Sequence, residues 1–75
     1  MQRYANLSGQ SGVVAYEIGR EAITVAFVGG HRYLYTVASA GAANIARMRE
    51  LAAAGRGLST FISQHVRESY ASKCD

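Results

Sequence analysis

Residues 22–37, AITVAFVGGHRYLYTV, are the most informative part of the sequence about the fold, because they hold two alternating segments around a glycine pair. Residues 22–28 alternate between large apolar and smaller side chains, and residues 32–37 set Tyr33, Tyr35 and Val37 against Arg32, Leu34 and Thr36. Period-two alternation with many β-branched and aromatic residues predicts two strands. The pair Gly29-Gly30 between them predicts a tight hairpin.

A third alternating segment precedes this hairpin at residues 13–18. It places Val14, Tyr16 and Ile18 on one side, and Gly19-Arg20 separates it from the next segment. The same period-two argument predicts a strand here. The sequence therefore predicts a three-stranded antiparallel sheet with meander connections.

The period changes after Val37. Residues 40–54 are rich in alanine, with large apolar residues at helical spacing, and Ser39 is the expected N-cap. A second helix is expected over about residues 60–70, with Ser59 as its cap. Strands followed by helices predict an α+β fold, in which both helices pack on one face of the sheet.

The chain has 75 residues, which is enough for a single domain only. Its expected parts, in order, are a flexible lead-in over 1–12, three strands over 13–37, two helices over 38–70 and a tail over 71–75. A domain of this size buries only about 60% of the surface of its unfolded chain, so its stability margin is thin.

Composition excludes several classes of protein. Hydrophobic residues make up 49% of the chain and charged residues 17%, which argues against disorder. No apolar run reaches the roughly 18 residues of a membrane span, so no membrane partner is expected. The start has no basic segment followed by an apolar one, so no secretory signal is expected. The single cysteine cannot form an internal disulfide, which favours the cytoplasm.

Residues suited to catalysis or metal binding are few. Asp75 is the last residue, Glu17 and Glu21 flank a predicted turn, and His31 sits at another turn. His65 falls on the apolar stripe of the second predicted helix, where packing is the expected role. The sequence offers no grouping of a nucleophile with a histidine and an acid that would form a catalytic triad. The spacing of its histidines and its cysteine matches no known pattern of metal ligands. We therefore expect a protein that is not an enzyme and has no cofactor.

Three short motifs follow one another along the chain: Tyr16-Glu17 with Ile23-x-Val25-x-Phe27, then Tyr33-Leu34-Tyr35 after a glycine turn, then Val66-Arg67-Glu68-Ser69-Tyr70. Their order and spacing, over roughly residues 8–70, resemble the KTSC domain. That family is named for the C-terminal end of some lysyl-tRNA synthetases and also occurs as a stand-alone bacterial protein. The resemblance implies no established reaction, and it implies RNA binding as the suggested role.

The register of the hairpin decides which way Tyr33 and Tyr35 face. With a two-residue turn, the tyrosines share the open face of the sheet with the small residues Thr24 and Ala26 and form a base-stacking platform. With a three-residue loop, Tyr33 lies opposite Phe27 and both tyrosines enter the core. A slip of one residue reverses every side chain, so both registers stay open from the sequence.

The net charge of +3 favours binding of an anionic partner over catalysis, although ordinary solubilising charges explain the same arginines. We expect a non-enzymatic binding module for RNA or tRNA, with protein–protein interaction or self-association as the alternative. Three strands leave two unpaired edges, which predicts a homodimer. The candidate RNA-binding residues are Tyr33, Tyr35, Arg47, Arg49, Arg56 and Arg67.

Overall fold

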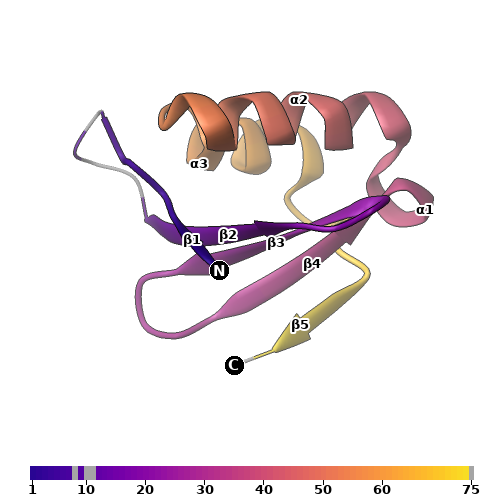
Figure 1. The fold of residues 1–75 in the computed structure, drawn as a ribbon. Coiled ribbons are helices and arrows are strands. Elements are labelled where there is room, and N and C mark those ends of the chain that lie inside the picture. Colours follow the sequence, from indigo (N-terminus) through magenta and orange to yellow (C-terminus); the bar gives the residue numbers. More distant parts are fainter. Residues whose placement is uncertain (8, 10–11, 75) are drawn as a thin grey trace.

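The computed structural model describes residues 1–7, 9 and 12–74, and it confirms the α+β class (Figure 1). Its elements are β1 (Gln2–Arg3), β2 (Val13–Ile18), β3 (Ala22–Phe27), β4 (Arg32–Thr36), α1 (Val37–Ala40), α2 (Ala42–Ala54), α3 (Leu58–Phe61), the π-helical turn η1 (Ile62–Val66) and β5 (Ser72–Cys74).

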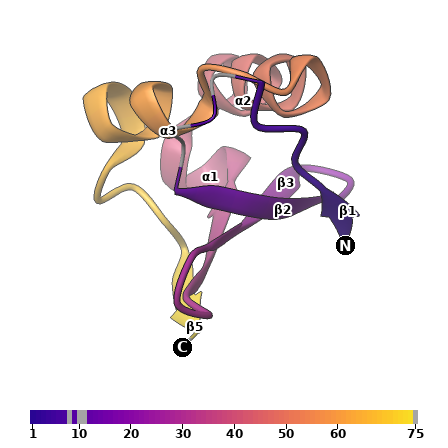
Figure 2. The ribbon, with the colours of Figure 1, turned by 90° about the vertical axis from the view of Figure 1, so that its left-hand side faces the viewer.

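The sheet has five strands rather than the expected three. All neighbours are antiparallel and their order is β1-β2-β3-β4-β5. Helices α2 and α3 lie over one face of the sheet in both ribbon views (Figures 1 and 2). The two added strands pair with β2 and β4, which were the expected free edges. The homodimer stays a prediction, and the unpaired-edge argument now applies only to the outer sides of two short strands.

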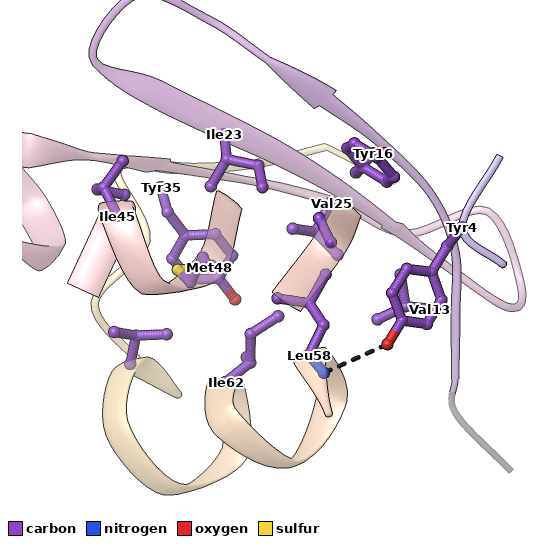
Figure 3. Close-up of a cluster of buried hydrophobic side chains, with 12 residues drawn as sticks. Tyr4, Val13, Tyr16, Ile23, Val25, Tyr35, Ile45, Met48, Leu58 and Ile62 are labelled. Carbon is purple, nitrogen blue, oxygen red and sulfur yellow. Dashed lines mark hydrogen bonds between the residues drawn. The ribbon is translucent and has the colours of Figure 1, made fainter. Parts of the chain in front are cut away.

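The expectation of a flexible lead-in is wrong for the first residues of the chain. The backbone N–H of Tyr4 donates to Val14 O at 3.0 Å, just beyond the β1–β2 pairing. The Tyr4 ring is buried, and its hydroxyl accepts a hydrogen bond from the backbone N–H of Leu58 at 3.3 Å (Figure 3). This bond ties the start of the chain to the start of α3. Residues 8, 10 and 11 of the expected lead-in lie outside the described residues.

The β3–β4 hairpin has a three-residue loop, Val28 to Gly30. The N–H of Phe27 donates to His31 O at 2.8 Å, and both loop glycines have positive φ. The register pairs Val25 with Tyr33, so the tyrosines face the helices. The three-residue alternative placed Tyr33 opposite Phe27, whereas the structure pairs Tyr33 with Val25. This pairing differs by two residues, and a shift of two leaves each side chain on the face that this alternative predicted. The base-stacking platform on the open face is therefore not formed.

A β-bulge changes the expected faces of β2. The pairing with β3 shifts between Val13 and Ala15, so Val13 and Tyr16 are both buried although they are three residues apart. Val14, expected beside Tyr16, is instead 44% exposed. An extra residue in one strand reverses the alternation beyond it, which explains the error.

The first helix begins earlier than expected. Thr36 is its N-cap, and Ser39 lies three residues inside it. The Thr36 hydroxyl accepts from the Ser39 N–H at 3.0 Å, while the Ser39 hydroxyl accepts from the Thr36 N–H at 3.0 Å. This reciprocal pair is a capping box and satisfies two helix-terminal donors. Gly41 then separates the short α1 from α2, so one expected helix is two.

The second helix also differs from its expected bounds. It begins at Leu58 after Gly57, so Ser59 lies within it and is not its cap. It widens into η1 and ends at Val66, which leaves residues 67–71 as a connection to β5. His65, expected on the apolar stripe, is exposed and lies against the ring of Phe61 at 4.6 Å.

The core lies between the helices and the inner face of the sheet (Figure 3). The helices contribute one apolar residue per turn, and β3 and β4 contribute residues from their inner face. Its fully buried large side chains are Tyr35, Ile23, Ile45, Met48, Leu58, Val13, Val25 and Val66.

Candidate functional site

A pocket of about 380 Å³ opens beside the core, between the hairpin end of the sheet and the α3–η1 helix. Its apolar wall comes from residues on both sides: Phe27, Tyr33, Tyr35, Ile62 and Tyr70. The Tyr33 and Tyr35 side chains of β4 reach it because the observed register turns them toward the helices. Ile62 belongs to η1, and π-helical turns occur often at functional sites.

The aromatic rings of this wall are in direct contact. The Tyr33 and Tyr35 rings are nearly parallel, with centroids 6.4 Å apart and planes 16° apart. Tyr70 stands edge-on to both, at 5.0 Å from Tyr33 and 6.4 Å from Tyr35. Phe27 meets Tyr33 edge-on at 5.5 Å. Edge-to-face contacts of this kind are favourable, and they hold the wall in one arrangement.

Tyr35 is the most deeply buried of the tyrosines that line this pocket. Its side chain is 1% exposed, and its hydroxyl points from β4 toward Ile62 (Figure 3). It forms no hydrogen bond with the described residues. Burial, and to a smaller extent the nearby hydroxyls of Tyr33 and Tyr70, raise the pKa of the Tyr35 hydroxyl to about 12. The phenol is therefore neutral at physiological pH and able to donate or accept a hydrogen bond.

The raised pKa of Tyr35 predicts an alkaline loss of stability. Because the pKa is 10.0 in the unfolded chain and about 12 in the folded one, the folded state holds the proton more tightly. This contribution to the free energy of unfolding is complete below pH 10 and is lost as the pH rises toward 12. Urea denaturation of the wild type at a series of pH values measures this loss.

Two variants that each lose one tyrosine hydroxyl, Tyr35→Phe and its control Tyr16→Phe, test whether Tyr35 is the cause. Tyr35→Phe is expected to lose less stability than the wild type between pH 10 and 12, while Tyr16→Phe, buried outside the pocket, loses as much as the wild type. An equal loss in Tyr35→Phe and the wild type would assign the effect to another group.

The remaining lining of the pocket is polar. It comprises His31, Ser59, Ser63, Arg67 and Glu68. Arg67 is exposed, and it forms no ion pair with any described residue. A guanidinium that has no ion pair within the described residues and shares a pocket with aromatic rings suits a ligand that is planar and anionic.

A second cation lies beside the aromatic wall. Lys73 belongs to β5, which pairs it with Tyr33 across the strands. Its Nζ atom stands over the Tyr33 ring, 5.6 Å from the centroid, within cation–π range. Lys73 therefore adds a positive charge next to Tyr33, and it does so because β5 pairs with β4 in the folded chain.

Only three of the six expected binding residues meet in this pocket, namely Tyr33, Tyr35 and Arg67. Arg47 is exposed on α2 beside Glu50, at 3.6 Å. Arg49 donates to the carbonyl oxygens of Gly19 and Arg20, each at 2.8 Å, which ties α2 to the β2–β3 turn.

Arg56 is exposed in the turn between α2 and α3 and is not part of the pocket lining. Arg47, Arg49 and Arg56 therefore do not join the tyrosines, and Arg49 has a structural role.

The sequence reading missed Phe27 and Tyr70 as members of the site. Tyr70 falls at the end of the expected second helix, which instead ends at Val66, so the sequence did not predict its contact with Tyr33. Its place at the end of the motif Val66 to Tyr70 was the one indication in the sequence. Phe27 alternates with Ile23 and Val25, a pattern that predicts a strand and indicates no binding role.

Within the described ranges, no cluster of three or more His, Cys, Asp or Glu is able to hold a metal ion. In the same part of the chain, none of the helices has both the length and the apolar character to cross a membrane. Comparison of the chain with family models, curated proteins and solved structures found no match.

Proposed function

We propose that this protein is a non-enzymatic, cytoplasmic RNA-binding module that takes one unstacked base of a single strand into the aromatic pocket. The observation that supports this most is the grouping of Tyr33, Tyr70 and Arg67 around a pocket of about 380 Å³. Proteins recognise single-stranded RNA by stacking splayed bases on aromatic rings or guanidinium planes.

The distribution of charge favours one anchoring nucleotide over a long charged track. The net charge is +3, and Arg47 and Arg49 are engaged by groups of the protein itself. Phosphate neutralisation alone then yields a modest, salt-dependent affinity. Most of the affinity for RNA is expected to come from the base and from one phosphate beside Arg67.

Replacing Arg67 by glutamine is expected to weaken binding of single-stranded RNA about tenfold and to lower the salt slope by about one. Arg47→Gln removes the same charge from the exposed face of α2 and is expected to change affinity less than about threefold. The measurement is a titration of isotopically labelled protein with single-stranded RNA and with total tRNA, read from amide shifts at low and high salt.

Two results contradict this proposal. If Arg67→Gln and Arg47→Gln weaken RNA binding equally, the affinity comes from the overall positive charge of the protein and not from contacts in the pocket. No binding at about 50 mM salt, where charge effects are strong, excludes RNA as the partner. The alternative function, interaction with a protein or with a second copy of this chain, then takes its place.

A further inference from the structure

We propose that the pocket binds a free nucleoside monophosphate, with its base against Tyr33 and Tyr70, a ring atom hydrogen-bonded to the Tyr35 hydroxyl and its phosphate on Arg67. This inference rests on the proposed site for RNA and names the smallest ligand that the site holds by itself.

The size of the pocket supports a single nucleotide. Its volume of about 380 Å³ lies near the lower end of the range for sites that bind small molecules. A ligand of one base, one sugar and one phosphate uses the aromatic wall and the polar lining together.

The Tyr35 hydroxyl supports a ligand with polar atoms on its ring. Tyr35 lines the pocket, and its hydroxyl has no hydrogen bond with the described residues, so a ligand in the pocket is the partner that it can reach. A purely hydrocarbon ring leaves this hydroxyl unsatisfied, whereas a nucleobase offers ring nitrogens and carbonyl oxygens. Because the pKa of Tyr35 is raised to about 12, its proton stays available for donation.

The charged residues around the pocket favour a ligand with one phosphate group over a ligand with three. Arg67 lines the pocket and Lys73 stands over Tyr33, but Glu68 also lines the pocket. Two cations and one carboxylate favour a small anion, and each further phosphate adds charge near Glu68. The site is therefore expected to prefer a monophosphate to a triphosphate.

The experiment titrates labelled wild-type protein with AMP, adenosine and ATP and follows the amide shifts. AMP is expected to shift the amides around Tyr33, Arg67 and Tyr70 at millimolar concentration or below, and to bind more tightly than either other ligand. Absence of these shifts with AMP, or tighter binding of ATP, overturns the inference.

Two variants test the assigned contacts. Tyr35→Phe is expected to weaken AMP about fivefold, while Tyr16→Phe, the same change outside the pocket, leaves affinity unchanged. Arg67→Gln is expected to weaken AMP about tenfold and adenosine by less than twofold. The amide spectrum of each variant reports that it is folded. Unchanged AMP affinity in Tyr35→Phe, or equal losses for both ligands in Arg67→Gln, overturns the assigned contacts.

The outcomes separate this inference from the proposed function. RNA binding without AMP binding leaves the RNA proposal in place and overturns the mononucleotide site. AMP binding without RNA binding supports the mononucleotide site and overturns the RNA proposal.

Discussion

Tyr35→Ala is expected to lower the free energy of unfolding by roughly 3–5 kcal/mol, the range for truncating a large buried aromatic side chain. The ring is fully buried in the cluster that holds Ile23, Met48 and Ile62 (Figure 3). A chain of 75 residues has a total stability of about 4–11 kcal/mol. The variant is thus expected to be largely unfolded or close to it, as measured by circular dichroism and urea denaturation.

The control for this prediction is Tyr70→Ala, which removes the same atoms from the same aromatic cluster. Tyr70 is 36% exposed, so its loss is expected to cost about half as much as the loss of Tyr35 or less. A stable Tyr35→Ala variant with a native amide spectrum would show that this ring does not support the core.

Gly55→Ala is expected to destabilise the protein by about 2–4 kcal/mol. Gly55 ends α2 with φ of +79°, a left-handed conformation that costs an alanine roughly 1 kcal/mol. Its added Cβ also meets the Cβ of Ala5 at 2.7 Å, and overpacking of this kind costs about 1–3 kcal/mol. The Ala5 segment has little freedom to move, because the N–H of Leu7 donates to Gly55 O at 2.6 Å.

Gly57→Ala separates the two causes. Gly57 has nearly the same backbone conformation, with φ of +81°, but its added Cβ meets only the end of the flexible Leu51 side chain, at 3.4 Å. A loss of about 1 kcal/mol is expected there. The double variant Ala5→Gly/Gly55→Ala is expected to recover part of the loss. Equal melting temperatures for the two single glycine variants would exclude the contact with Ala5 as a cause.

Elements long enough to show a period were predictable from the sequence. The three central strands are within one residue of their expected bounds, and α2 ends at Ala54 before Gly55 as expected. Strands β1 and β5 were not predictable, because two or three residues show no periodicity. They are strands only because β2 and β4 offer unpaired backbone groups to them.

The candidate site was predictable only in its residue types. The sequence pointed to Tyr33, Tyr35 and Arg67, but it grouped them with three arginines that lie elsewhere. Arg49 shows why, since its partners Gly19 and Arg20 are some thirty residues away in the chain. Contacts over such separations depend on how the helices lie on the sheet, which residue spacing does not describe.

The α+β class, the order of strands and helices, and the aromatic pair in the third central strand all follow from patterns in the amino-acid sequence. The direction in which this pair faces depends on the folded hairpin, because a one-residue change in its register reverses the face while leaving the strand pattern intact. The pocket is likewise a tertiary feature. It exists because the early end of η1 at Val66 lets the chain return along β4 and place Tyr70 against Tyr33.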